Sequence, residues 1–170
     1  MKFSDILHAR HSVRRYAAAP VEGEKRDQIL QAARHAPTAA NRQPVRLFVV
    51  ESPDGLARLG KAANLYGAPL AILVCCDRTK AWTRPFDGKQ TTDIDAAILT
   101  DHMMLQATEL GLGSVWICYF QPDVVRAEFA LPETLEPVNL LAIGYADDGG
   151  GDPTRFDRER IPLDELATMR

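Results

Sequence analysis

The sequence predicts an α/β or α+β protein with a central β-sheet flanked by helices, in a single domain of 170 residues. Three observations support this fold class. Segments with strand character alternate with segments of helical periodicity. The run PLAILVCCD at 69–77 is apolar throughout, as in a strand that is covered on both faces. Hydrophobic residues make up 46% and charged residues 25% of the chain, which suits a globular domain with a core.

The first part of the chain is expected to hold two helices ahead of the first strand. Ser4 can cap a short helix that ends near Arg10. Residues 23–36 follow helical periodicity, and this helix should stop because Pro37 disfavours helical geometry in the residue before it. The apolar residues of 46–51 then predict the first strand.

The later elements continue this alternation. They are expected as a helix at 53–64, a strand at 69–77, a polar loop at 78–92, a helix from Thr92 to Gly111, a strand at 114–118, a helix at 122–129 and a strand at 138–146. On the long helix, Ile94, Ile98 and Leu105 return at helical spacing and predict its apolar stripe. Asp93 and Asp95 at its start are explained by the helix dipole. Because helices connect the strands, we expect some parallel pairing in a mixed sheet.

Composition and charge exclude several classes of protein. The formal net charge of −3 does not favour nucleic acid as a partner. No apolar run approaches the roughly 20 residues that span a bilayer. A secretion signal needs an unbroken apolar stretch near the N-terminus, but the start of this chain, MKFSDILHAR, contains Asp5 and His8. We therefore expect a cytoplasmic protein. Cys75, Cys76 and Cys118 lack zinc spacing, and we expect no metal site.

Common catalytic motifs are also missing from the sequence. It has no P-loop and no G-x-S-x-G elbow. The glycines at 111–113 follow an expected helix, whereas the glycines of a dinucleotide-binding fingerprint follow a strand, so this motif is excluded too. No acid–base pair stands out. Two clusters of hydrogen-bonding residues remain, without an obvious nucleophile or base. This combination is typical of a protein whose reactive atoms belong to a bound cofactor.

The first cluster is ARHSVRRY at 9–16. In extended geometry Arg10, Ser12 and Arg14 point the same way. Two guanidinium groups flanking a hydroxyl suit a phosphate, which they can bind through charge-assisted bonds. Residues 1–46 hold nine Lys/Arg and four Asp/Glu, a charge of +5 on an acidic protein. The alternative interpretation is an exposed basic linker.

The second cluster is APTAANRQP at 36–44. Small residues at 38–40 allow the backbone to approach a flat ligand closely, while Asn41 and Gln43 can both donate and accept hydrogen bonds, as a heteroaromatic edge requires. An ordinary polar turn is the alternative interpretation.

Four segments in the same order resemble the FMN-dependent nitroreductase family. They are RHSVR near the N-terminus, APTAANRQP before a strand, LGLGSVWI after the long helix, and IGYA before a tail with Pro and Arg. The resemblance extends from about Phe3 to Arg160. It implies an α+β fold with a central mixed β-sheet, an intertwined homodimer and FMN at the subunit interface. Residues 147–170 would wrap the partner subunit, and a tail so poor in core residues needs some surface to contact.

The resemblance also assigns residues to the cofactor. Arg10, His11 and Ser12 would hold the FMN phosphate and ribityl chain, and Arg14 would lie near the flavin N1–C2 carbonyl edge. The loop that packs beside the isoalloxazine ring, usually from the other subunit, comprises Pro37, Thr38, Ala39, Asn41 and Gln43. The backbone of Trp116, Ile117 and Cys118 would run near N5, although glycine is common at position 118 in short relatives. Arg155, or else Arg158, would return to the phosphate.

The expected reaction is a ping-pong transfer of hydride from NAD(P)H through flavin N5 to a nitroaromatic, a quinone or a similar acceptor. Arg14 can stabilise the negative charge that reduction places on N1 and O2. Alternatives on the same fold are ene reduction, dehalogenation, flavin fragmentation or a non-catalytic flavin-binding module. Segment 78–92, with Trp82 and Phe86, either shapes the pocket or is an exposed loop.

Overall fold

The computed structural model describes residues 2–147, 149–152 and 154–170. One sheet holds four strands in the order β1-β2-β4-β3. The strands are β1 (Val45–Val50), β2 (Leu70–Asp77), β3 (Gly113–Ile117) and β4 (Leu135–Gly144). The helices are α1 (Phe3–Ala9), α2 (Gly23–His35), the 3-10 turn η1 (Ala39–Asn41), α3 (Pro53–Gly60), α4 (Thr92–Glu109), α5 (Pro122–Phe129), α6 (Arg155–Glu159) and α7 (Leu163–Leu166).

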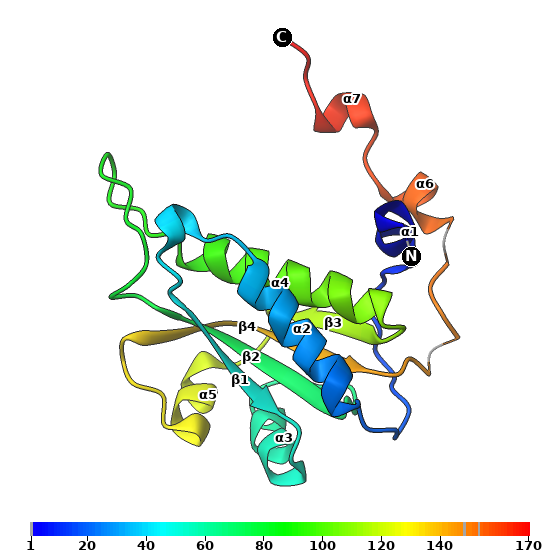
Figure 1. The fold of residues 1–170 in the computed structure, drawn as a ribbon, viewed down its shortest axis with the longest axis horizontal. Coiled ribbons are helices and arrows are strands. Elements are labelled where there is room, and N and C mark those ends of the chain that lie inside the picture. The colour runs from blue at the N-terminus through cyan, green and yellow to red at the C-terminus, as the bar shows by residue number, and fades with distance from the viewer. Residues whose placement is uncertain (1, 148, 153) are drawn as a thin grey trace.

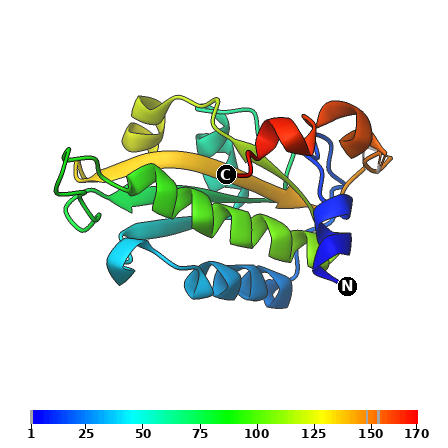
Figure 2. The ribbon, with the colours of Figure 1, turned by 90° about the horizontal axis from the view of Figure 1, so that it is seen from above.

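Helices cover both faces of the sheet, which confirms the predicted fold class. α2 and α4 lie on one face, and α3 and α5 lie on the other (Figures 1 and 2). Along β2, Ile72 and Val74 are buried in the core under α2 and α4, whereas Leu73 and Cys75 are buried in the core under α3 and α5. The unbroken apolar run of this strand is therefore explained by a separate core on each face.

The strand pairing differs from the expectation. β1–β2, β2–β4 and β3–β4 are all antiparallel, so the expected parallel pairing is wrong for the four strands. The connection through α3 leaves and re-enters the sheet at the same end, since Val50 pairs with Ala71 at the start of β2. Among the described residues, the parallel contact is an isolated bridge between Ser12 and Ser114.

The largest differences from the predicted element boundaries are the end of α3 and the start of β4. α3 ends at Gly60 instead of residue 64. The N–H groups of Lys61 and Ala62 donate to carbonyls three residues earlier, as in a tight final turn. β4 begins at Leu135 instead of residue 138 and passes through Pro137. The ladder register shifts next to this proline, and an irregularity of this kind tolerates a residue without an N–H.

The long helix α4 buries a different face from the one expected. Its fully buried apolar residues include Ala96, Met103 and Ala107, whereas Ile94, from the predicted stripe, is 49% exposed. Ile98 is only half-buried. α4 is apolar on two faces, and hydropathy alone does not tell which of them the sheet will cover. The outward face remains uncovered in a single protomer.

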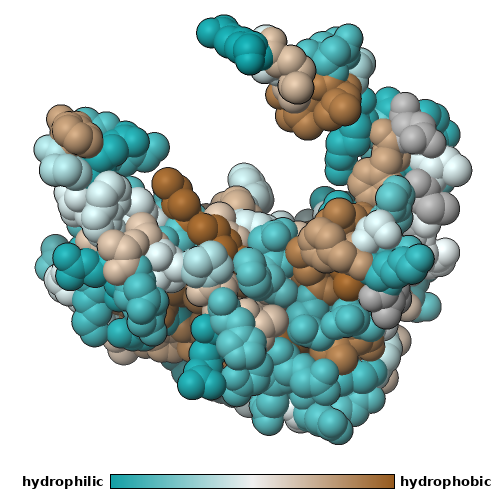
Figure 3. Space-filling model, turned by 45° about the horizontal axis from the view of Figure 1, so that its top comes forward, coloured by the Kyte–Doolittle hydropathy of each residue, from teal (hydrophilic) through white to brown (hydrophobic). Residues whose placement is uncertain are grey.

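Two segments project from the body. Residues 78–92, expected as a loop, form a hairpin with a Thr83–Gln90 bridge and an Arg84–Asp87 ion pair near its tip, where Phe86 is 93% exposed. α6 lies beside α1, whereas the end of the C-terminal tail, with α7, extends away from the sheet across an open gap (Figures 1 and 3). Its exposed apolar side chains are Ile161, Leu163, Leu166 and Met169.

Candidate functional site

The segment after α1 runs beside the beginning of β3. Val13 is fully buried and donates its N–H to the Ser114 carbonyl at 3.0 Å, while Ser12 and Arg14 on either side of it are exposed. The predicted alternation of this segment is therefore present. Gly113 permits the close approach, because a Cβ there would lie 2.5 Å from a Val13 methyl carbon.

Three arginines converge at the end of α1. Arg155 donates a hydrogen bond to the Arg10 carbonyl, and the guanidinium groups of Arg155 and Arg160 lie over the Phe156 ring, 4.8 and 5.2 Å from its centroid. Burial lowers the pKa of Arg10, the positive charges of Arg155 and Arg160 lower it further, and Asp101 opposes them. We name Arg10, Arg155 and Arg160 the arginine cluster. Like charges held together this way fit a phosphate, which would offset their repulsion.

The two alternatives for the late phosphate ligand have different surroundings. Arg155 belongs to the arginine cluster, whereas Arg158 forms an ion pair with Asp152. Arg160 was missed by the sequence reasoning, although the spacing of RFDRER at 155–160 was a signal for it. His11 is packed by the tail, since a Cβ on Gly151 would lie 2.7 Å from its ring. The described residues contain no group of side chains suited to a metal ion.

The second predicted cluster forms a tight loop between α2 and β1. The Thr38 hydroxyl accepts the Gln43 N–H at 3.0 Å, and the Gln43 side-chain amide donates to Asn41 Oδ1 at 3.2 Å. Ala40, Asn41 and Gln43 have left-handed φ values of 49°, 52° and 50°. Such values are unfavourable for residues other than glycine, least so for Asn. We name residues 38–43 the amide loop; Pro37 precedes it and is exposed.

A buried carboxylate anchors this loop, and the sequence reasoning missed that role. Asp95 of α4 is fully buried, and its Oδ1 accepts the Ala39 N–H at 2.8 Å. Its Oδ2 accepts the Thr91 hydroxyl at 3.0 Å. A helix dipole accounts for an acidic residue at this position but not for its burial.

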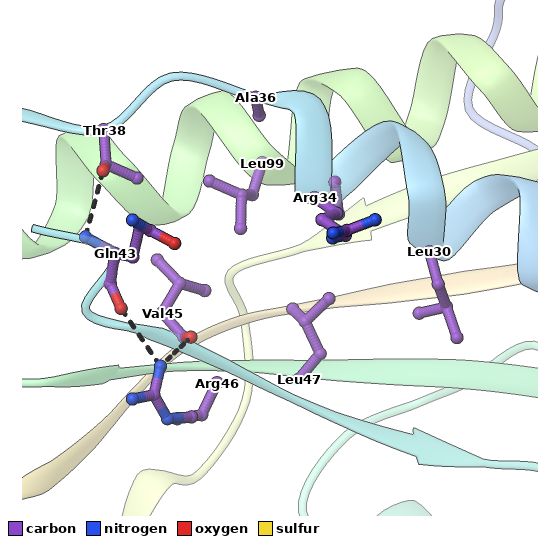
Figure 4. A pocket seen from close by; sticks show the side chains of 10 residues that line it. Leu30, Arg34, Ala36, Thr38, Gln43, Val45, Arg46, Leu47 and Leu99 are labelled. Atoms are coloured by element: carbon purple, nitrogen blue, oxygen red, sulfur yellow. Dashed lines mark hydrogen bonds between the residues drawn. The ribbon is translucent and has the colours of Figure 1, made fainter. Parts of the chain in front are cut away.

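A pocket of about 220 Å³ lies beside the amide loop (Figure 4). Its lining residues are Leu30, Ala33, Arg34, Ala36, Thr38, Gln43, Val45, Arg46, Leu47 and Leu99. Arg46 is held in place by hydrogen bonds from its guanidinium to the carbonyls of Gln43 and Val45. The pocket thus combines an apolar floor with a polar rim, as small-molecule sites do.

β3 is an edge strand whose open side adjoins the arginine cluster. The Ser114 carbonyl points to this side, and strand alternation directs the backbone of Trp116 the same way. Ser114 Oγ and Trp116 Nε1 are buried without a hydrogen-bond partner in the described part of the chain. The Ile117 side chain is buried, and Cys118 follows the strand and is exposed. The backbone of Trp116 on the open side of the strand and the exposed residue Cys118 are therefore accessible to a ligand.

One protomer does not bring the two clusters together. Ser114, next to the first cluster, pairs with Ile143 near the end of β4. The amide loop precedes Val45, which pairs with Cys76, and Cys76 pairs with Glu136 near the start of β4. Seven residues of strand separate Glu136 from Ile143, or roughly 23 Å. Figure 1 shows α1 and η1 at opposite ends of the sheet.

Fold and sequence comparisons agree on the class. The chain has the fold of a nitroreductase family protein from Clostridium difficile 630, with a TM-score of 0.97, 55% identity and coverage of 99% of this chain and 98% of that one. An FMN-dependent nitroreductase from Clostridium difficile R20291 is 28% identical, with a TM-score of 0.74 and coverage of 93% and 96%.

Sequence relatives lead to the same family. A protein of Methanothermobacter thermautotrophicus, provisionally named an NADH dehydrogenase/NAD(P)H nitroreductase, is 31% identical over 95% of this chain and 87% of its own length. The model of the nitroreductase family matches residues 7–64 and 57–145. The chain therefore belongs to the nitroreductase family, a family of oxidoreductases. No helix within the described residues is long and apolar enough to cross a membrane.

Proposed function

We propose that this protein is an FMN-dependent NAD(P)H oxidoreductase that reduces nitroaromatics, quinones or similar electron-poor acceptors. The arginine cluster is the observation that carries the proposal. Arg155 donates to the Arg10 carbonyl, and Arg155 and Arg160 both lie over the Phe156 ring beside α1. Burial lowers the pKa of Arg10, and the positive charges of Arg155 and Arg160 lower it further. A phosphate group of the cofactor provides the missing counter-charge.

The proposed active form is a homodimer with FMN at the interface. Two features support a second copy. The two polar clusters lie at opposite ends of one sheet, so a ring that contacts both must take the amide loop from the partner. In addition, the tail of each protomer exposes Ile161, Leu163 and Leu166, and the outward face of α4 exposes Ile94. We propose that the tail, residues 147–170, wraps the partner and covers such apolar surface.

The residues of this chain would divide the work of binding. The arginine cluster would fix the phosphate, with Ser12 beside it, and the exposed guanidinium of Arg14 would place a fixed positive charge at the N1–C2 edge of the ring. Backbone groups of Trp116 and Cys118 would line the N5 side. When bound, FMN would supply the hydride chemistry between NAD(P)H and the acceptor, in a ping-pong order. No acid–base pair is then required of the protein.

An anaerobic titration tests this function. The protein, purified and supplied with FMN, should retain a yellow flavin spectrum that NADH or NADPH bleaches and that a nitroaromatic or quinone restores. Gel filtration with light scattering should give the mass of a dimer. A protein that takes up no FMN would refute the proposal, and bound flavin that neither nucleotide bleaches would point to a non-catalytic flavin module.

A further inference from the structure

Asp95 is the one fully buried acidic side chain among the described residues, and it has no ion-pair partner there. Two neutral donors satisfy it, the Ala39 N–H on Oδ1 and the Thr91 hydroxyl on Oδ2. A buried carboxylate costs desolvation free energy and is retained only where hydrogen bonds compensate. Asp93, in the same helical turn, is exposed. An acidic residue can therefore interact with the helix dipole at this end of α4 without being buried.

The loop that Asp95 holds is strained. Ala40 and Gln43 adopt left-handed backbone conformations, which non-glycine residues keep only when the surroundings enforce them. The other side-chain bonds of the amide loop, from Thr38 to Gln43 and from Gln43 to Asn41, stay within it. Asp95 connects the loop to a long helix that is packed on the sheet, and so it fixes where the loop lies.

The same carboxylate also contacts the base of the 78–92 hairpin. The Thr91 N–H donates to the Trp82 carbonyl at 3.0 Å, and the hydroxyl of Thr91 donates to Asp95. Asp95 therefore lies at the junction of the amide loop and the hairpin.

We propose that Asp95 is a positioning residue of the cofactor site. It acts through the Ala39 backbone to hold the amide loop in its strained shape, so that Asn41 and Gln43 are preorganised for the flavin ring, and through Thr91 it aligns the hairpin with them. The ligand in this inference rests on the proposed function, whereas the mechanical role does not.

Four variants separate positioning from general stability. Asp95→Ala removes the anchor. Asp95→Asn keeps it, because the amide oxygen accepts the Ala39 N–H and the amide nitrogen can donate to Thr91. Ala39→Pro removes the donor and leaves Asp95 in place, and the extended Thr38 (ψ 157°) is compatible with a following proline. Asp93→Ala is the control, since it loses an acidic residue from the same turn.

Two readouts are needed. Hydrogen–deuterium exchange of the Asn41 and Gln43 amides, measured without cofactor, reports the loop itself. Fluorescence titration gives the dissociation constant of FMN. We expect Asp95→Ala and Ala39→Pro to speed exchange of these amides and to raise the dissociation constant about tenfold or more, whereas Asp95→Asn and Asp93→Ala stay within about threefold of the wild type.

The outcomes distinguish this inference from the proposed function. If the wild type binds FMN and Ala39→Pro keeps both the exchange protection and the affinity, the positioning role is wrong and the function stands. Failure of Asp95→Asn to rescue the properties lost in Asp95→Ala would overturn it as well. If no variant binds FMN, the proposed function fails, and the exchange rates still decide whether Asp95 holds the loop.

Discussion

The two polar ends of the sheet differ in what each one lacks. In the arginine cluster, burial lowers the pKa of Arg10, the positive charges of Arg155 and Arg160 lower it further, and the negative charge of Asp101 opposes them only in part. At the other end, the amide loop satisfies its own hydrogen bonds but holds Ala40 and Gln43 in left-handed conformations. The arginine cluster is therefore subject to electrostatic repulsion, whereas the amide loop is subject to backbone strain.

This difference indicates that the two clusters contribute to ligand binding in different ways. Repulsion among guanidinium groups is relieved by an anion that binds, so the arginine cluster should contribute mainly to affinity. Backbone strain is not relieved by a ligand. It is maintained by the buried anchor Asp95 and yields a fixed shape, so the amide loop should contribute mainly to orientation.

The largest effect on FMN affinity is expected from removing a positive charge from the arginine cluster. Arg10→Ala and Arg155→Ala should each raise the dissociation constant of FMN about tenfold to hundredfold, because each removes charge-assisted hydrogen bonds to the phosphate. Fluorescence titration measures this. Arg158→Ala is the matched control, since Arg158 is paired with Asp152, and it should change affinity little. An equal loss in all three variants would contradict the arginine cluster.

The contact that holds the first cluster against the sheet can be broken separately. Gly113→Ala would place a Cβ 2.5 Å from Val13, which is fully buried. We expect a loss of about 1–3 kcal/mol in the free energy of unfolding, as for other overpacked positions. Urea denaturation gives the value, with Gly60→Ala as the control, because no atom lies within 4 Å of a Cβ there.

The free energy of unfolding should fall at alkaline pH, because β2 contains two buried thiols. Burial raises the pKa of Cys75 and of Cys76 to about 12, above the usual value for a thiol. The unfolded chain releases these protons first, so stability is full below about pH 9 and falls as the pH rises towards 12, by at most about 1.4 kcal/mol per pH unit for each thiol. Urea denaturation at pH 8 and pH 10 should show a smaller fall in the Cys75→Ala, Cys76→Ala double variant.

Arg14 tests whether charge near the ring acts on the reduced flavin. Arg14→Ala should lower the two-electron midpoint potential by about 30 mV, equivalent to about 1.4 kcal/mol, because the reduced flavin loses a nearby cation. A spectroelectrochemical titration measures the shift, and the dissociation constant of the oxidised cofactor should change little. A lost affinity with an unchanged potential would place Arg14 among the phosphate ligands instead.

The smallest effect concerns the strain itself. Ala40→Gly should raise the free energy of unfolding by about 0.5–1 kcal/mol, because glycine adopts the φ of 49° without the steric cost of a Cβ. Thermal or urea denaturation measures the gain. Ala130→Gly, at another left-handed position with φ of 49°, serves as the control and should gain a similar amount. A loss of stability in Ala40→Gly alone would show that the loop is not strained at this residue.

Local patterns determined much of this protein. Proline and glycine positions marked where α2 and α4 end, the apolar run of 69–77 predicted a strand covered on both faces, and alternation in 12–14 predicted that Ser12 and Arg14 share one side. The family could also be recognised from four short segments in order. Each of these signals depends on residues close together in the chain.

Only the tertiary structure decided the remaining features. The antiparallel pairing of all four strands, the choice of buried face on α4 and the meeting of Arg160 with Arg10 depend on contacts between residues far apart in the sequence. Asp95 is the clearest case, because its sequence position suits a helix dipole equally well. Which apolar face is buried, and which carboxylate finds a donor, is set by the packing of whole elements, a long-range free energy that no local pattern contains.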